Sequence, residues 1–194
     1  MPTWVLIALV LIGGLITVKF LFAASIVTVF PITRGAMFHP SASVRVKTFL
    51  DRVSMNPGDL LVDIGCGDGR VLRGARRCYG VRALGFEVNP IAYLMARLRT
   101  FGMKGIEIRY SDFWKSALDE ADVVFCYLFP DVMKRVADKL ETELRPGARV
   151  VSCNFPLPGW KPLEVLHPDS SLHGDPIYLY RFPDACRSGS SERS

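Results

Sequence analysis

Val62-Asp63-Ile64-Gly65-Cys66-Gly67-Asp68-Gly69-Arg70 is the stretch that decides the fold. Two leucines precede it, so a short apolar run ends in a glycine-rich bend. Such a run is typical of a strand buried on both faces of a parallel sheet. Glycines at alternate positions let the backbone turn sharply and let a ligand approach the main chain. We therefore predict a strand over 60–64, a ligand-binding bend, and a helix from Arg70 to about Tyr79.

The same alternation continues along the chain. We predict further helices over 89–101 and 131–144, and further strands over 81–86, 106–110, 121–126, 148–153 and 177–182, the last paired with a segment in 163–166. Strands that alternate with helices form an open, mostly parallel α/β sheet. Ligands of such sheets bind at the carboxyl ends of the strands, so we expect the site at the bend 63–69.

The acidic residues of the bend indicate which of two classes of cofactor it binds. A nicotinamide dinucleotide site uses G-x-G-x-x-G and places a pyrophosphate on the next helix. Here the spacing is G-x-G-x-G, and Asp63 and Asp68 flank the glycines. Carboxylates repel a pyrophosphate and attract a cation. S-adenosylmethionine carries both an ammonium and a sulfonium group, so we predict it as the cofactor. The bend residues predicted to bind it are Asp63, Gly65, Cys66, Gly67, Asp68 and Gly69.

Later strand ends extend the predicted cofactor site. Glu87 ends the second strand about 20 residues past the bend, where an acid accepts hydrogen bonds from the ribose of an adenosine. After the third strand, Asp112 can accept the adenine amino group while Phe113 packs on the base. Helix capping by Ser111 or Asp112 explains the same residues equally well.

The segment Cys126-Tyr127-Leu128-Phe129-Pro130 follows the fourth strand and would face the transferable methyl group. Tyr127, Phe129 and Pro130 are candidates for an apolar channel that admits the substrate, although these residues would also fit a core. Asp68 is a further candidate, as an orienting or proton-accepting group. The catalytic residues stay unassigned, because transfer from a sulfonium is an in-line displacement helped mainly by positioning.

The N-terminal segment predicts a single membrane anchor. Trp4–Ala23 is apolar except for Lys19 near its end, and it has the length of about 20 residues that a bilayer span needs. Pro31 should end the helix. A cleaved signal peptide would need a basic region before the apolar stretch, and only Met-Pro-Thr stands there. Basic residues follow the segment, so we expect the catalytic domain on the cytoplasmic side, or on the matrix side of an organelle.

The domain organisation follows from these patterns. We predict an anchor over 1–33, a connector helix in 34–56 that starts near Pro40, a catalytic domain over 57–184, and a serine-rich disordered tail over 185–194. The five cysteines include no C-x-x-C pair, so we predict neither a metal site nor a disulfide framework.

Basic residues outnumber acids between Arg70 and Arg109, by nine to two. A solvated basic face, contact with anionic lipid headgroups, and contact with nucleic acid would each explain this excess. Because an anchor confines the domain to a membrane, we rank lipid or a membrane-protein substrate above nucleic acid.

Several segments carry a resemblance to a known family. Besides the bend, they are Gly67-Asp68-Gly69-Arg70, Gly85-Phe86-Glu87-Val88-Asn89-Pro90, Asp112-Phe113-Trp114-Lys115, Phe129-Pro130 and Gly147-Ala148-Arg149-Val150-Val151-Ser152-Cys153-Asn154-Phe155-Pro156. The bend resembles the first motif of the class I, seven-strand methyltransferases. Together the segments resemble the small membrane-anchored protein-lysine methyltransferases whose mitochondrial members modify the adenine nucleotide translocase and ATP synthase subunit c. Phe113 stands where the family is expected to have leucine.

The resemblance implies an open, mostly parallel Rossmann-like sheet of seven strands, with an antiparallel last strand over 177–182 beside the fifth. It implies S-adenosylmethionine bound by Asp63, Gly65, Gly67, Glu87 and Asp112, and N-methylation of a lysine in a membrane-associated protein. A prokaryotic plasma membrane and a mitochondrial membrane both fit. Two alternative functions stay open: methylation of a lipid, quinone precursor or other small molecule, and a non-catalytic membrane scaffold that binds the cofactor.

Overall fold

Helices and strands alternate through the domain in the predicted order. The computed structural model describes residues 2–33, 43–168 and 174–186, with the backbone alone for 25–33 and Ser43. The helices are α1 (Thr3–Thr33), α2 (Ser43–Arg52), α3 (Arg70–Tyr79), α4 (Pro90–Arg99), the short 3-10 helix η1 (Phe113–Lys115) and α5 (Pro130–Glu143). The strands are β1 (Leu60–Ile64), β2 (Arg82–Glu87), β3 (Ile106–Tyr110), β4 (Val123–Cys126), β5 (Arg149–Cys153), β6 (Glu164–Leu166) and β7 (Ile177–Arg181).

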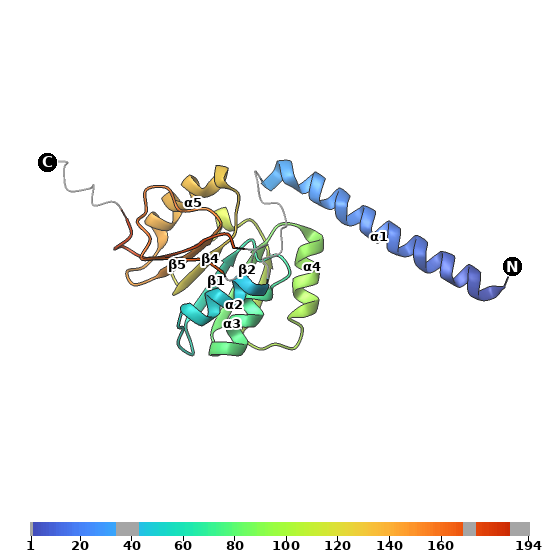
Figure 1. The fold of residues 1–194 in the computed structure, drawn as a ribbon, viewed down its shortest axis with the longest axis horizontal. Coiled ribbons are helices and arrows are strands. Elements are labelled where there is room, and N and C mark those ends of the chain that lie inside the picture. The colour runs from blue at the N-terminus through green and yellow to red at the C-terminus, as the bar shows by residue number, and fades with distance from the viewer. Residues whose placement is uncertain (1, 34–42, 169–173, 187–194) are drawn as a thin grey trace.

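The strands form one sheet with the order β3-β2-β1-β4-β5-β7-β6 (Figure 1). β1 to β5 pair in parallel, whereas β7 runs antiparallel to both β5 and β6. The antiparallel strand beside the fifth, and its pairing with the segment before it, confirm the predicted topology. The chain passes outward from β1 to β2 and β3 and then returns to β4 on the other side of β1. The topological switch point therefore lies between β1 and β4, where ligands bind in such sheets.

Alternating side chains of β1 supply the two cores of the domain. Val62 and Ile64 pack on one face with residues of α5, and Leu61 packs on the other face with residues of α2 and α3. The strand is buried along its whole length, because helices cover both faces of the sheet. Figure 1 shows α5 on one side of the sheet and α2 and α3 on the other.

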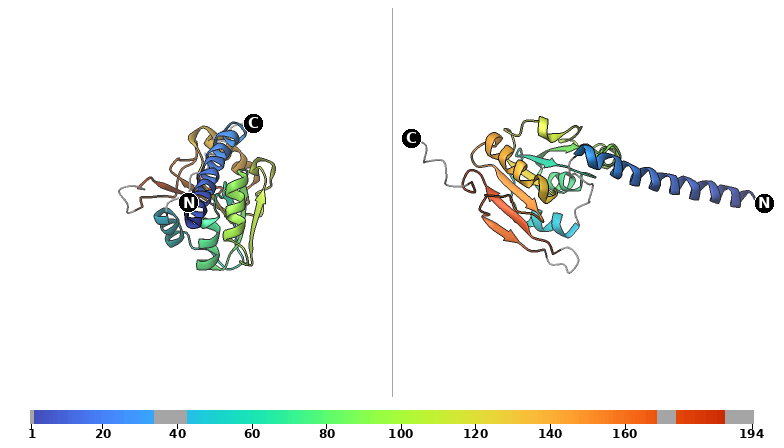
Figure 2. Two further views of the ribbon diagram at one scale, coloured as in Figure 1. Left: turned by 90° about the vertical axis from the view of Figure 1, so that its right-hand side faces the viewer. Right: turned by 90° about the horizontal axis from the view of Figure 1, so that it is seen from above.

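α1 is an apolar helix that leaves the domain beside α4 (Figures 1 and 2). Its segment Thr3–Ala24 is long and apolar enough to cross a bilayer, and its side chains are largely exposed. Apolar side chains on every side of a helix are unfavourable in water and favourable in hydrocarbon. The helix continues past Pro31, the predicted end, to Thr33. An interior proline removes one backbone donor and crowds the carbonyl oxygen four residues earlier, so it weakens or kinks a helix without always ending it.

The connector and the tail are only partly described. α2 lies within the predicted connector 34–56, and the predicted helix start near Pro40 is outside the described residues. Ala185 is buried in the core that contains Trp160, and its N–H donates to the carbonyl oxygen of Arg181. Packed structure thus extends through Cys186, into the stretch 185–194 for which the sequence predicts a disordered tail. Residues 187–194 are outside the described residues.

Gly85 in β2 has no room for a side chain. A Cβ there would lie 2.6 Å from Leu72 Cδ1 and 2.7 Å from Cys66 Sγ. Gly85→Ala should therefore lower the free energy of unfolding by about 1–3 kcal/mol, because neither neighbour can withdraw without disturbing the bend or α3. Urea unfolding in detergent, followed by tryptophan fluorescence, measures the change. Arg82→Ala, at the exposed start of the same strand, is the control and should stay within about 0.5 kcal/mol of the wild type. Equal stability of the two variants would contradict this packing.

Candidate active site

The bend after β1 uses backbone conformations that favour glycine. The φ angles of Gly65, Gly67 and Gly69 are 87°, 55° and 73°, all in the left-handed region. Gly69 is also the N-cap residue of α3. A Cβ on Gly65 would lie 3.4 Å from Leu128 Cδ2, so the bend is close to the segment that follows β4. The bend therefore joins the two sides of the topological switch point.

Glu87 ties the bend to the end of β2. Its carboxylate accepts hydrogen bonds from the backbone N–H groups of Gly67 (2.8 Å), Val88 (2.9 Å) and Asn89 (2.8 Å). Burial raises the pKa of Glu87, and these three donors act against the rise. A carboxylate has about four acceptor positions. Glu87 therefore keeps capacity for a further donor, such as a ribose hydroxyl.

Asp63 is a buried acid in β1, beneath the bend. Its side chain is 3% exposed. Burial raises the pKa of Asp63 well above its usual value, and the charges of Glu87 and Asp68 raise it further. A buried carboxylate among like charges costs free energy unless a cation or hydrogen-bond donors compensate it. The site is therefore electrostatically suited to a positively charged ligand.

Asp68 is compensated within the protein. Its carboxylate pairs with Arg70 at the start of α3 (Nε to Oδ1, 2.9 Å) and with Arg99 at the end of α4. Burial acts to raise the pKa of Asp68, but the hydrogen bonds and charge of Arg70 and the charge of Arg99 together lower it below its usual value. Asp68 is thus a weak base that links the bend to two helices.

Cys66 is placed in the bend by packing. It is 5% exposed, and its Sγ is directed at the bare backbone of Gly85. Burial raises the pKa of the Cys66 thiol well above its usual value, and nearby acids add to the effect. Burial also raises the pKa of the Cys126 thiol, at the end of β4, to about 12. Both thiols are neutral near pH 7, and neither is suited to act as a thiolate nucleophile.

Asp112 and Phe113 follow β3, next to the end of β2. The N–H of Ser111 donates to the carbonyl oxygen of Glu87 (3.2 Å), which keeps Asp112 close to Glu87. Oδ1 of Asp112 accepts a hydrogen bond from the N–H of Trp114 (3.0 Å), so the capping interpretation is confirmed for Asp112. Phe113 is 8% exposed, and its ring packs against Trp114 with the centroids 4.3 Å apart. The Phe113 ring is therefore part of the core wall at this end of the sheet.

The segment after β4 carries the predicted channel residues. Tyr127 and Phe129 are half-buried, and Pro130 is the exposed first residue of α5. Because β4 pairs with β1 in parallel, these residues follow a strand end that adjoins the bend. The structure thus brings the predicted cofactor and substrate residues to one end of the sheet.

Arg45 is a residue of this region that the sequence reasoning missed. It is 3% exposed and reaches from α2 to Tyr127, where Nη1 donates to the hydroxyl (2.8 Å) and the guanidinium lies 5.1 Å from the ring centroid. It also forms an ion pair with Asp175, while its buried Nε has no hydrogen-bond partner in the described part of the chain. The sequence offered one clue to this role: Arg45 stands next to Val46, in a helix whose apolar residues are spaced to face the core.

Comparison with known proteins identifies the family. A family model described as the ANTKMT methyltransferase domain matches residues 63–164, from Asp63 in β1 to Glu164 in β6. The chain belongs to this methyltransferase family. A protein-lysine N-methyltransferase from Saccharolobus islandicus (strain REY15A) is 34% identical over 145 residues, covering 73% of this chain and 90% of the relative. A lysine N-methyltransferase from Xenopus laevis, named for a subunit of ATP synthase, is 34% identical over 165 residues, covering 82% of this chain and 71% of the relative.

A solved structure adds the fold and the cofactor. An RNA methyltransferase from Salinibacter ruber, in complex with S-adenosyl-L-homocysteine, has a TM-score of 0.69 and 30% sequence identity, covering 77% of this chain and 97% of that chain. S-adenosylhomocysteine is what remains of S-adenosylmethionine after the methyl group has left. The methyltransferase therefore uses S-adenosylmethionine, and both the predicted cofactor and the predicted seven-strand fold are confirmed.

Asp63→Asn should make the unliganded methyltransferase more stable near neutral pH. The pKa of Asp63 is higher in the folded than in the unfolded protein, so the folded state holds the extra proton between these two values and stability falls as pH rises through them. Asparagine has no such proton. Its gain in melting temperature should thus be largest at about pH 7 and vanish toward about pH 4, near the unfolded carboxyl pKa. Thermal unfolding across this range checks the trend, and a gain that is independent of pH would contradict it.

Proposed function

We propose that this methyltransferase methylates a lysine side chain of a membrane-associated protein. One observation carries the proposal. The same chain contains an apolar helix long enough to cross a bilayer and a domain whose relatives are named lysine N-methyltransferases. In this proposal, residues 1–33 are the anchor, 34–56 the connector and 57–184 the catalytic domain, and the tail over 185–194 begins with Ala185 and Cys186 packed on that domain. The catalytic domain is on the cytoplasmic side of the membrane, or on the matrix side of a mitochondrial one.

The residues around the bend fit S-adenosylmethionine. Asp63 and Glu87 are buried acids whose pKa values are raised, so a cation beside them would offset the cost of their burial. When bound, the cofactor supplies an electrophilic methyl group on a sulfonium. Asp63 and the glycines of the bend would hold its cationic part, and Glu87 would accept the ribose hydroxyls. Asp112 would accept the adenine amino group.

Three other predicted cofactor residues support the site in this proposal. Cys66 is buried against Gly85 and Phe113 is buried against Trp114, so both would shape the site from within the core. Asp68 holds the bend against α3 and α4 through its two arginines. Because these arginines lower its pKa, we assign Asp68 no proton transfer.

The segment after β4 is the proposed contact for the substrate lysine. Tyr127, Phe129 and Pro130 would pack along the apolar stem of the lysine. Removal of water lowers the pKa of a lysine and favours the neutral amine, which is the nucleophile. Arg45 would act as a positioning residue, since its hydrogen bond and its ring contact hold Tyr127 from the side of α2.

Methyl transfer to membrane extracts tests the substrate class. Full-length protein in vesicles would be incubated with S-adenosylmethionine labelled on the methyl group and with membranes, soluble protein and RNA from the same cells. Label in a protein band that resists solvent extraction, located on lysine by peptide mass spectrometry, is the expected result. Label in the lipid phase would support a small-molecule substrate, ribonuclease-sensitive label would support RNA, and the absence of label would support a scaffold. Each of these three outcomes would overturn the proposal.

Glu87→Gln should weaken the binding of S-adenosylmethionine at least tenfold, which is about 1.4 kcal/mol. The amide keeps the size of the side chain but replaces one acceptor oxygen by a donor, which would face backbone N–H groups or ribose hydroxyls. Isothermal titration calorimetry measures the affinity, and thermal unfolding reports whether the bend stays folded. Glu107→Gln is the matched control, because the Glu107 side chain is 59% exposed in β3 and should leave the affinity unchanged. A folded Glu87→Gln variant with wild-type affinity would contradict the ribose assignment.

A further inference from the structure

An exposed apolar stripe runs along α4 and continues just beyond its end. Leu94, Leu98 and Phe101 are 57%, 68% and 90% exposed. Their spacing places them on one side of the helix, while Ala92 and Ala96 are buried on the other. Isolated exposed apolar residues are common, but an aligned set of large ones is unfavourable in water and marks an interaction surface.

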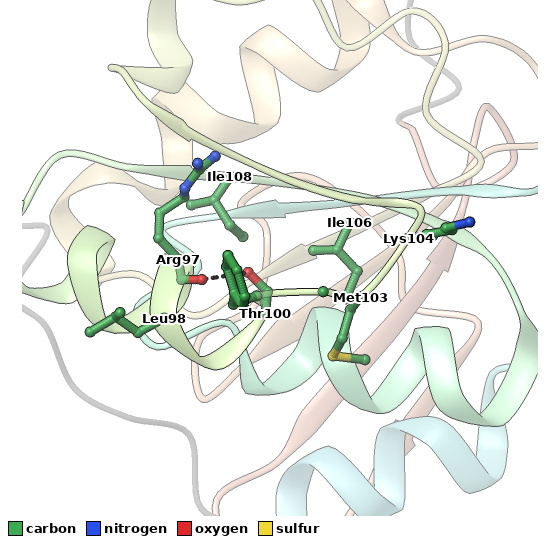
Figure 3. Close-up of a pocket in the computed structure, with 9 residues that line it drawn as sticks. Arg97, Leu98, Thr100, Met103, Lys104, Ile106 and Ile108 are labelled. Atoms are coloured by element: carbon green, nitrogen blue, oxygen red, sulfur yellow. Dashed lines mark hydrogen bonds between the residues drawn. The ribbon is translucent and has the colours of Figure 1, made fainter.

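Two cations flank the stripe. Arg97 and Lys104 are both exposed, and neither forms an ion pair in the part of the chain that the structure describes. A groove between the end of α4 and the start of β3 contains both residues, together with Met103 and Ile106 (Figure 3). Figure 3 shows Arg97 and Lys104 on opposite sides of this groove. The groove adjoins the start of β3, so it is separate from the site at the carboxyl ends of the strands.

The position of α1 indicates what covers the stripe. α4 lies on the side of the domain from which α1 projects, and the two helices are in contact (Figures 1 and 2). If Thr3–Ala24 crosses a bilayer, as in the proposed function, α4 is the element of the catalytic domain that is brought toward the membrane surface. Three other large hydrophobic residues of the domain are exposed: Tyr110 at the end of β3, and Leu163 and Val165 at the opposite edge of the sheet, beside and within β6.

We infer that the stripe of Leu94, Leu98 and Phe101, with Arg97 and Lys104, binds the surface of a bilayer that contains anionic phospholipid. The apolar side chains enter the boundary between headgroups and acyl chains, and the cations face the lipid phosphates. Charge complementarity and continuity with an apolar helix favour this occupant over a protein partner. The inference rests on the proposed membrane attachment and is independent of the lysine substrate.

This second contact would set the orientation of the catalytic domain. A single helix tether leaves the domain free to rotate about the tether, so the site would face the membrane only part of the time. With α4 on the bilayer, one edge of the sheet is always turned toward the lipid. The carboxyl ends of the strands then keep a constant orientation relative to a substrate embedded in the same membrane.

Tryptophan substitution tests the contact in the full-length protein. Phe101→Trp and the matched control Leu163→Trp would be reconstituted in phosphatidylcholine vesicles with and without phosphatidylglycerol, using lipids brominated near the headgroup end of the acyl chains. In phosphatidylglycerol vesicles, the added emission of Phe101→Trp should be quenched and shifted to the blue. The added emission of Leu163→Trp should remain unquenched. Combining Phe101→Trp with Arg97→Gln and Lys104→Gln should reduce the quenching to its level in phosphatidylcholine alone.

Native Trp4, which is 70% exposed in α1, reports on the anchor separately. Quenching of the wild-type protein by lipids brominated along the acyl chain shows that α1 is inserted. Inserted α1 with an unquenched Phe101→Trp would overturn the inference and leave the anchor in place. The absence of quenching in both would overturn the anchor, and the inference with it. Strong quenching that does not change when phosphatidylglycerol is omitted, or when both cations are replaced, would overturn the part played by charge.

Discussion

Glu87 holds the site together, because three backbone N–H groups from two segments converge on its carboxylate. One of them, from Gly67, belongs to the bend after β1, and the other two, from Val88 and Asn89, lead into α4. A buried donor that loses its partner costs about 1–3 kcal/mol. The acid therefore sets the distance between the bend and the end of β2. In the proposed function, the cofactor would bind in the crevice beside these bonds.

The acids at the bend differ in how their charges are compensated. Asp68 is neutralised by Arg70 and Arg99, which lower its pKa and join the bend to two helices. Asp63 and Glu87 are buried with raised pKa values, and three backbone N–H groups offset part of the cost of burial for Glu87. In the proposed function, this cost of burial is found at the positions that would face a positively charged methyl donor.

Much of the site was predictable because its signals are local. A glycine at a left-handed φ, an acid at a strand end and an apolar run before a bend can each be recognised within a few residues. The antiparallel last strand beside the fifth followed from the family resemblance, and the sheet confirms it. Arg45 was not predictable in the same way. Its hydrogen bond to Tyr127 joins α2 to a loop that lies far along the chain. The spacing of apolar residues in a helix predicts which face is buried, but not which distant loop an arginine on that helix will contact.

The sequence by itself determined the alternation of strands and helices, the class of cofactor and the presence of an apolar helix suited to a bilayer. These properties depend on residue periodicity and on the charge of a short loop. Only the tertiary structure decided which acid is neutralised, which residue holds Tyr127, and that Leu98 and Phe101 remain uncovered at the end of α4. Such features depend on which segments fold side by side. Local patterns contain no information about long-range neighbours, so these assignments required the folded chain.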